Sequence, residues 1–362
     1  MLPLLGLPPI VLGVIGMILG FYELAKNHYP YRKPHHTIVR ITVGLDSKDG
    51  LSGAGGDLPD IQIFNEVGGY IGKASKRGKI KSGEFVDIPI KHNHHSSQQP
   101  AYALFAANGN AICIPHVTTT WPDGSQYAWL GDWGRRCGGM WYYSNIYLLP
   151  SGIKPNCLWI DENTERFRTG FQLHWPEFSH DDGDEALDTA EAKAAKVDYL
   201  CTAGPPFTMH TYPNSHTNQI AFWEPEGKGV NGSRVENGHR AIGSATGMLK
   251  RPASVRSESG EGNSGANELT TEALMGMSLV VSDAEEHSAE ELCGSPDSFG
   301  PDFFNARTGT FCRMSEKTIW PACSSANSTD NCFHDTLHQL VVDGIVARDE
   351  PYAKIIDWTA GK

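Results

Sequence analysis

Four polar side chains in the first half of the chain are the candidates for acid–base chemistry. His116 lies in AICIPHVTTTW and His174 in QLHWPEF, where apolar neighbours indicate burial. Glu177 follows His174 by three residues, and Asp132 lies in GDWGRR. A buried histidine beside a carboxylate is a typical general acid–base pair. The same residues equally suit a structural interior, because no nucleophile or second carboxylate stands at a readable spacing beside them.

A run of aromatic rings is the densest chemical feature. Four tryptophans and four tyrosines lie between Trp121 and Tyr147, eight rings in 27 residues, against 10% aromatic residues in the whole chain. Such rings stack on sugars and apolar ligands, and they also fill protein cores. The glycines in GDWGRRCGGMWYY argue against a regular strand, so we expect some rings to leave the core. The predicted ligand surface consists of Trp129, Trp133, Trp141 and Tyr142, with Arg135 and Arg136 on its rim.

Two polar stretches contain metal-binding residue types. His92, His94 and His95 lie in KHNHHSSQQP, and the loop Asp46–Asp57 with Asp60 is rich in carboxylates and glycine. The acidic loop lacks the residue order of an EF-hand, and both stretches are more typical of solvated loops. The sequence also has no G-x-S-x-G, H-E-x-x-H, P-loop or Rossmann pattern. We therefore predict no metal site and no cofactor.

The elements that position these residues are predicted to be strands. Val39, Ile41 and Val43 recur with the period of two that marks a half-buried strand, and DIQIF, FVDIPI, YALFAAN and AICIPHVTTTW repeat it. Asn108-Gly109 predicts a tight hairpin between the last two runs, and Trp121–Ser125 predicts a turn into SQYAW. Short strands without a βαβ rhythm predict a mainly β fold. We expect an antiparallel β-sandwich or jelly-roll-like domain with a disordered insertion and a small Cys-rich C-terminal module.

Changes in composition divide the chain into five segments. Residues 1–22 are apolar and predict a signal peptide or signal anchor, and residues 23–36 predict a linker. Residues 37–224 predict the β-sandwich domain, with an acidic insertion near 177–196 that contains a short exposed helix. Residues 225–275 predict a low-complexity flexible segment, and residues 276–362 predict a Cys-rich C-terminal module that packs on the β domain.

Several features favour the secretory route. The longest uninterrupted apolar stretch of the leader, Ile10–Tyr22, is shorter than a membrane span, yet no basic residue precedes it and no A-x-A site follows. Eight cysteines, none in a C-x-x-C pair, accompany two N-x-S/T sequons, at Asn231 and Asn327. We therefore predict a secreted, glycosylated protein. The alternative is a membrane-anchored protein held by residues 2–22.

The even number of cysteines predicts four disulfides. The eight residues are Cys113, Cys137, Cys157, Cys201, Cys293, Cys312, Cys323 and Cys332. Proximity in the sequence suggests that Cys113 pairs with Cys137 and Cys157 with Cys201. The last four cysteines form two further bridges whose connectivity stays open, because four cysteines allow three pairings.

Four long runs carry a family resemblance: GDWGRRCGGMWYYSNIY, CLWID, TGFQLHWPEF and YLCTAGPPFTMHTYP. Together with the C-terminal runs SAEELCGSPDSFGPDFFN and GTFCRMSEKTIWPAC, they resemble a group of uncharacterised secreted proteins of filamentous ascomycete fungi. The resemblance extends over most of residues 37–340. It implies secretion and disulfide bonds, and it assigns no activity, cofactor or catalytic residue.

The charge balance narrows the partners. Lysine and arginine number 30 against 42 acidic residues, a net charge of −12, which argues against a nucleic-acid partner. The leading hypothesis is a non-catalytic protein that binds an extracellular glycan, an apolar small molecule, or a cell-wall or host component, with membrane contact only through its N-terminal segment. The alternatives are a secreted hydrolase or metal-dependent oxidase that uses His116, Asp132, His174 and Glu177, and a membrane-anchored structural protein. Convergence of those four residues would favour the enzyme, and scattering would favour binding.

Overall fold

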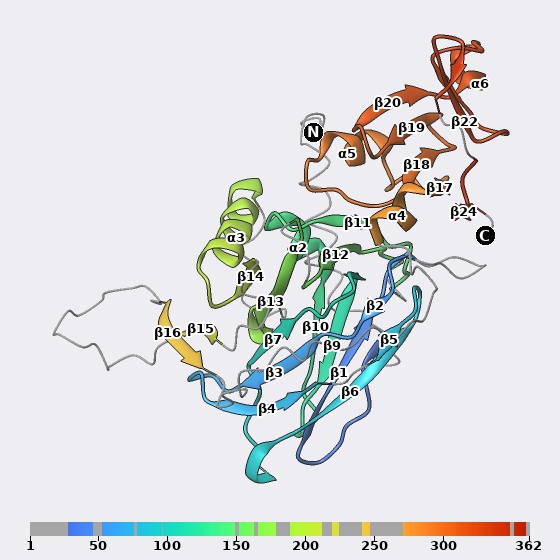
Figure 1. Ribbon diagram of the computed structural model, residues 1–362. Coiled ribbons are helices and arrows are strands. Elements are labelled where there is room, and N and C mark those ends of the chain that lie inside the picture. Colours follow the sequence, from blue (N-terminus) through green and yellow to red (C-terminus); the bar gives the residue numbers. More distant parts are fainter. Residues whose placement is uncertain are drawn as a thin grey trace, which may run out of the picture.

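The computed structural model describes most of the chain between residues 28 and 359. The described ranges are 28–45, 53–75, 78–95, 97–148, 152–162, 166–178, 189–211, 219–223, 241–246, 271–347 and 351–359. The predicted leader and most of the predicted flexible segment lie outside them. Within the described residues the chain is mainly β, as predicted. Figure 1 shows a β-sandwich in blue to green below and a C-terminal module in orange to red above.

The first sheet of the sandwich has four antiparallel strands in the order β10-β9-β1-β6. Their bounds are β1 His36–Thr42, β6 Phe85–Lys91, β9 His116–Thr120 and β10 Gln126–Leu130. The turn at Asp123-Gly124 joins β9 to β10, with the Gly124 amide donating to the Trp121 carbonyl (3.0 Å). The hairpin predicted at Trp121–Ser125 is therefore confirmed.

The second sheet has eight strands, six of which follow the order β11-β12-β13-β7-β3-β4. These strands are β3 Asp60–Phe64, β4 Tyr70–Ala74, β7 Tyr102–Ala106, β11 Trp141–Tyr143, β12 Asn156–Ile160 and β13 Arg168–His174. The remaining two are β8 Ile112–Ile114, which pairs with β12, and β14 Phe207–Thr211, which pairs with β13. All pairs in this sheet are antiparallel except the single register pair between β12 and β13.

One predicted hairpin does not form. Asn108-Gly109 follows β7, but β7 pairs with β3 and β13, while β8 pairs with β12. The chain therefore leaves one part of the large sheet at this turn and enters another. The prediction of a β7–β8 hairpin is wrong because partners from distant parts of the sequence compete successfully with the local one.

The two sheets enclose a continuous apolar core. Val39, Ile41 and Val43 point into it from the first sheet, as their spacing predicted, and Phe105 and Phe171 from the second. Each of these five side chains is fully buried. Burial of this kind stabilises the fold by roughly 1.5–3 kcal/mol for each large apolar side chain.

The predicted N-terminal linker is attached to the sandwich in its described part. The Thr118 and Thr120 hydroxyls on β9 donate to the carbonyls of His28 (2.8 Å) and Pro30 (2.7 Å). Arg32 donates to the Pro122 carbonyl at 2.7 Å. Residues 28–32 therefore run along β9 rather than forming a free connection.

Helices and short strands cover the flanks of the sandwich. They are β2 Gly56–Asp57, β5 Lys79–Ile80, η3 Asn93–His95, α2 Gly131–Arg136, η4 Trp175–Phe178, α3 Ala190–Thr202, β15 Gln219–Trp223 and β16 Ala241–Thr246. Helix α3 realises the predicted exposed helix, and a Thr189 hydroxyl caps it by accepting from the Ala192 amide (3.1 Å). Strand β16 lies inside the predicted flexible segment and pairs with β15, so this part of the segment is structured.

The C-terminal module combines a five-stranded sheet with a three-stranded one. Its elements are α4 Thr271–Gly276, β17 Ser278–Ser282, α5 Ala289–Gly294, β18 Asp302–Asn305, β19 Thr310–Arg313, β20 Thr318–Pro321, α6 Cys323–Ala326, β21 Cys332–His334, β22 Gln339–Val342, β23 Ile345–Val346 and β24 Lys354–Asp357. The first sheet has the order β20-β19-β18-β17-β24, in which β17 pairs in parallel with both neighbours. The Asp343-Gly344 turn joins β22 to β23 in an antiparallel hairpin.

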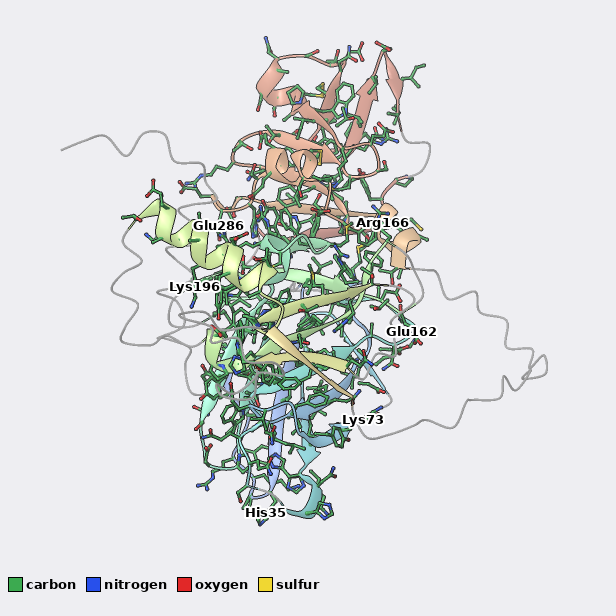
Figure 2. All side chains as sticks on the ribbon, turned by 90° about the vertical axis from the view of Figure 1, so that its left-hand side faces the viewer. His35, Lys73, Glu162, Arg166, Lys196 and Glu286 are labelled. Atoms are coloured by element: carbon green, nitrogen blue, oxygen red, sulfur yellow. A yellow bond between two sulfur atoms is a disulfide. The ribbon has the colours of Figure 1, made fainter. Side chains whose placement is uncertain are left out.

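The module lies against one end of the sandwich. Figure 2 shows Arg166 and Glu286 near the level where the two parts meet, and His35 at the opposite end. No helix in the described ranges is both long and apolar enough to cross a membrane.

Candidate functional site

The rings of the predicted ligand surface are buried. Trp129, Trp133, Trp141 and Tyr142 all belong to the main core, and none exposes more than 3% of its surface. Trp129 stacks on Phe171 with ring centroids 4.8 Å apart. The prediction that these four rings form a ligand surface is therefore wrong, because the interior of the protein uses them.

Two of the rings hold the C-terminal module. Trp141 Nε1 donates to Ser295 Oγ (3.1 Å), and the Tyr142 hydroxyl donates to the Pro301 carbonyl (2.8 Å). A Cβ at Gly300 would overlap the Tyr142 ring, so glycine permits this close approach. The aromatic run therefore binds a segment of its own chain.

The two arginines lie at the same contact and do not form a ligand rim. The Arg135 guanidinium lies 3.6 Å from the centroid of the Trp141 ring and forms an ion pair with Glu291 on α5. Arg136 is half-buried and interacts electrostatically with Asp132 and Glu291. Their positive charge is thus used within the molecule, where it offsets neighbouring carboxylates.

All eight cysteines form disulfides. The bridges are Cys113–Cys157, Cys137–Cys201, Cys293–Cys312 and Cys323–Cys332. The two bridges inside the C-terminal module agree with the prediction, but the pairings Cys113–Cys137 and Cys157–Cys201 are wrong. The reason is the sheet, since the antiparallel pairing of β8 with β12 brings Cys113 beside Cys157.

His116 and Asp132 are each held by a structural partner. His116 Nε2 lies 2.9 Å from the Thr42 hydroxyl, and Asp132 accepts from the side-chain amide (2.5 Å) and backbone amide (3.2 Å) of Asn156. Burial lowers the pKa of His116 to about 3, so this imidazole stays neutral at physiological pH. Burial also raises the pKa of Asp132, although the hydrogen bonds from Asn156 oppose the shift. Neither residue contacts the other two catalytic candidates.

His174 and Glu177 do come together, and three further residues join them. His174 Nε2 lies 2.9 Å from Oε2 of Glu66, and Nδ1 lies 3.7 Å from Oε1 of Glu177. The Tyr199 hydroxyl donates to the same Glu177 oxygen (2.9 Å). The Tyr102 ring stacks on the imidazole with centroids 4.3 Å apart. These five residues, Glu66, Tyr102, His174, Glu177 and Tyr199, are called the His174 cluster below.

Strand register builds the cluster from segments that are distant in the sequence. His174, the last residue of β13, stands opposite Tyr102 at the start of β7, and Tyr102 stands opposite Phe64 at the end of β3. Glu66 follows Phe64 by two residues. The chain then turns from β13 into the single turn η4, which places Glu177 one 3₁₀ turn after His174 and on the same side.

Opposing effects set the protonation of the cluster. Burial would lower the pKa of His174, but hydrogen bonds and charges from Glu177 and Glu66 outweigh it, and the pKa is raised. For Glu177, burial would raise the pKa. The opposing effects of His174, Tyr199 and Lys196 outweigh burial, and the pKa is lowered below its ordinary value. Burial and the Glu177 charge keep the Tyr199 hydroxyl protonated, with a pKa well above its ordinary value. The raised pKa favours the imidazolium form of His174 relative to a free histidine.

One side of the cluster is open to solvent and bordered by aromatic rings. The Glu66 side chain is 59% exposed, whereas that of Glu177 is 17% exposed. Tyr199 and Trp223 are half-buried, and their rings lie parallel within 6°, with centroids 6.3 Å apart. The Trp223 amide donates to the Tyr102 hydroxyl (3.0 Å) and thereby ties β15 to the cluster. Lys196, labelled on α3 in Figure 2, lies above the Tyr199 ring at 5.8 Å.

The polar stretches considered for metals take other roles. His92 is buried, with Nε2 2.7 Å from the Thr37 hydroxyl, and Asp60 pairs with Lys73 at 3.2 Å. His94 is exposed, and the acidic loop lies largely outside the described residues. Among the described side chains, no group of three or more His, Cys, Asp or Glu residues is arranged to hold a metal ion.

Of the two sequons, Asn327 lies within the described residues. Asn327 is exposed at the end of α6 in the left-handed conformation (φ 47°, ψ 42°), within the exposed run Ser324–Thr329. Its backbone amide donates to the Cys323 carbonyl, so the backbone is held while the side chain faces solvent. Asn231 lies outside the described residues.

Sequence reasoning found two members of the cluster and missed three. The three-residue spacing in QLHWPEF identified His174 and Glu177. Glu66, Tyr102 and Tyr199 carry no local signal, because Glu66 is 108 residues from His174 in the sequence. Correct pairing of β3, β7 and β13 is the signal that would have found Glu66 and Tyr102.

Comparison with known proteins gives little further information. No protein-family model matches the chain, and no curated protein matches it. Two crystal structures of LOX deletion variants show a weak likeness, each with a TM-score of 0.20. Their sequence identities are 18% and 14%, over 26% and 36% of this chain and 15% and 17% of theirs. This chain thus spans less than a fifth of the LOX chains, and at these scores no shared fold or function follows.

Proposed function

We propose that this protein is a secreted, disulfide-bonded glycoprotein that binds an extracellular glycan without turning it over. The His174 cluster, with the neighbouring Trp223 ring, is its binding site. One observation carries the proposal. The exposed carboxylate of Glu66 lies on the same face as the half-buried rings of Tyr199 and Trp223. The two other acid–base candidates are engaged elsewhere with structural partners.

The chemistry of the face suits a sugar. Pyranose rings present apolar C–H faces, which stack on aromatic rings, and hydroxyl edges, which donate to carboxylates. Glu66 has one oxygen on His174 Nε2 and an exposed second side. The ring of Trp223 and the ring of Tyr199 supply flat surfaces beside it. Tyr102, beneath the imidazole, is fully buried and supports the face from below.

The position of His174 supports binding rather than hydrolysis. In glycoside hydrolases two carboxyl groups flank the bond that is cleaved, so the sugar occupies the space between them. Here the imidazole contacts Glu66 through one nitrogen and faces Glu177 through the other. A scissile bond cannot occupy that space while His174 is in place. This position of the imidazole between Glu66 and Glu177 supports a binding role for the two carboxylates rather than hydrolysis.

Extracellular placement rests on separate observations. The four disulfides suit an oxidising compartment, the Asn327 sequon is exposed, and the runs that resemble secreted fungal proteins point the same way. The leader that would direct export, or anchor the protein through residues 2–22, lies outside the described residues. We propose that Asn327 carries an N-linked glycan, and that Asn231 is the second acceptor.

The binding proposal is tested with a glycan array followed by titration calorimetry on the purified protein. Glu66→Gln should weaken binding of the selected glycan by about 5- to 30-fold, since it alters one polar contact worth about 1–2 kcal/mol. Glu84→Gln, at an exposed acidic residue on the turn before β6, is the matched control and should bind normally. Absence of any glycan ligand, or equal affinity of all variants, contradicts the proposal.

The same samples address the alternatives. Release of a shortened glycan during long incubation would support the enzyme. Glycosylation is read by mass before and after treatment with an N-glycosidase, with Asn327→Gln and Asn231→Gln each expected to remove one glycan. Fractionation of the natural source distinguishes a free secreted protein from one that stays with membranes.

A further inference from the structure

The proposed glycan site presents one carboxylate to solvent. The Glu66 side chain is 59% exposed, and within the described residues the ion pair with His174 Nε2 (2.9 Å) is the one that it forms. Glu177, by contrast, is 17% exposed and accepts from the Tyr199 hydroxyl (2.9 Å). The positive charge of Lys196 also acts on Glu177 and lowers its pKa. The negative charge that a ligand meets at this site is therefore mainly that of Glu66.

Strand β15 places the Trp223 ring near the turn that carries Glu66. Phe222, the residue before Trp223, packs on this turn, where a Cβ at Gly68 would lie 2.6 Å from the Phe222 ring. The Trp223 amide donates to the Tyr102 hydroxyl (3.0 Å), and the Tyr102 ring stacks on the imidazole that contacts Glu66. The carboxylate and the aromatic ring thus share one support, so a single ligand can contact both.

The aromatic rings of the site suit a cation as well as the face of a sugar. Tyr199 and Trp223 are half-buried, with ring planes parallel within 6°. The face of such a ring carries partial negative charge and attracts an ammonium group within about 6 Å of its centroid. The Lys196 ammonium lies 5.8 Å from the centroid of the Tyr199 ring, which is an example of this attraction in the same site. Aromatic faces beside an exposed carboxylate therefore favour a ligand that carries an ammonium group.

The charges also indicate which glycans the site disfavours. The carboxylate of an acidic sugar would meet the like charge of Glu66, and the net charge of −12 acts in the same direction at longer range. A neutral sugar can stack on the rings and donate hydroxyl groups, but it brings no positive charge to Glu66. Only a cationic sugar satisfies both the rings and the carboxylate.

We propose that the glycan bound at the His174 cluster is an amino sugar with free amino groups. Its ammonium group pairs with the exposed side of Glu66, and its pyranose ring packs against Trp223 and Tyr199. This inference rests on the proposed function, because it names the class of glycan that the same site binds. An ammonium group donates a charge-assisted hydrogen bond to a carboxylate, which is stronger than the hydrogen bond of a sugar hydroxyl. N-acetylation removes this charge and leaves the pyranose ring in place.

The test uses titration calorimetry with a glucosamine oligosaccharide and its fully N-acetylated form of equal length, in a mildly acidic buffer that keeps the amines protonated. The unmodified protein should bind the glucosamine form about 5- to 30-fold more tightly, since a hydrogen bond to a charged donor replaces one to a neutral donor. We call this ratio of affinities the amine preference. Added salt should reduce it, because the exposed charges are then screened. An oligogalacturonate of the same length should bind more weakly than either form.

Two substitutions should move the amine preference in opposite directions. Glu66→Gln removes the carboxylate charge and should reduce the preference to about twofold or less, within the range of an exposed ion pair that has been lost. Lys196→Gln removes the resident positive charge beside the rings and should raise the preference by about two- to fivefold. Glu84→Gln and Lys81→Gln, at exposed residues in the turn before β6, change the net charge equally and are the matched controls. They should leave the preference unchanged.

The outcomes separate this inference from the proposed function. Equal affinity for the two oligosaccharides, or an amine preference that survives Glu66→Gln, overturns the inference, although the proposed function stands if the N-acetylated form binds. Equal shifts in Glu66→Gln and Glu84→Gln also overturn it, because the preference would then follow net charge. A linear polyamine that binds as tightly as the glucosamine oligosaccharide has the same consequence, because the rings would then contribute nothing to sugar recognition. Absence of binding by every glycan contradicts the proposed function itself.

Discussion

His174 should make the stability of this protein depend on pH in a predictable direction. Its pKa is raised in the folded protein above the ordinary value of 6.5, because Glu177 and Glu66 outweigh the effect of burial. A histidine of this kind binds its proton more tightly when folded than when unfolded. Its stabilising contribution is therefore complete below the unfolded pKa and is lost as the pH rises through the folded pKa.

The magnitude follows from the exposure of the two carboxylates. The Glu66 side chain is 59% exposed, so solvent screens its attraction for the imidazolium, and Glu177 faces Nδ1 at 3.7 Å, beyond ideal hydrogen-bond distance. Together these pairs should contribute about 1 kcal/mol, which corresponds to about 2–4 °C in melting temperature for a domain of 150–250 residues. Removal of the imidazole should cost this amount in acid and not in alkali.

The assay compares the melting temperatures of the unmodified protein and His174→Gln from about pH 5.5 to about pH 8.5, on either side of the ordinary histidine pKa. The gap between the two proteins should be wider at the acidic end by about 2–4 °C. Other histidines also affect stability: His116 and His287 have folded pKa values of about 3, so they destabilise the fold in acid. This effect is the same in both proteins and cancels in the difference between their melting temperatures. His36→Gln, at a half-buried histidine on β1 outside the cluster, is the control. A gap that is constant, or wider in alkali, would refute this account of the cluster.

Three substitutions test the packing of the aromatic run. Trp129→Ala should lower the free energy of unfolding by about 3–5 kcal/mol in urea titrations, and a loss below about 1 kcal/mol would show that the ring is not in the core. Gly300→Ala forces a Cβ against Tyr142 and should cost about 1–3 kcal/mol, measured by the same titration; unchanged stability would place this contact elsewhere. Arg135→Ala loses the contact with the Trp141 ring and the ion pair with Glu291, and we expect the free energy of unfolding to fall by about 1 kcal/mol. Because salt screens the ion pair in the unmodified protein, this difference should be smaller at high salt concentration.

Local patterns predicted the elements that depend on neighbours in the sequence. DIQIF became β3 with the predicted bounds, and the Asp-Gly turn at Gly124 joined the expected hairpin. The Asn108-Gly109 turn failed because β7 and β8 each find partners far along the chain. Turn residues determine how the chain bends, and the competition among strands determines what pairs after the bend.

The same limit explains what was found and missed at the candidate site. His174 and Glu177 belong to one strand end and the turn after it, so their spacing was informative. Glu66 reaches His174 only through the register of three strands. Disulfide pairing failed likewise, since the partner of Cys113 is set by β12 and not by the shortest loop. A long-range prediction needs the sheet order first, and alternation of apolar residues does not contain it.

The glycines of the aromatic run show how a correct observation led to a wrong inference. Their spacing in the sequence predicts an irregular, exposed loop, from which rings would leave the core. In the structure they mark close packing: a Cβ at Gly131 would overlap the Asn156 carbonyl, and one at Gly134 or Gly139 would collide with Leu158. Helix α2 therefore lies directly on β12, with the rings packed around the contact. Glycine between large rings is compatible with an exposed loop and with a closely packed core. The two are distinguished by whether another part of the chain packs against the rings. A core requires a second apolar surface elsewhere in the chain, and here Phe171 supplies it for Trp129 and Phe178 for Trp133.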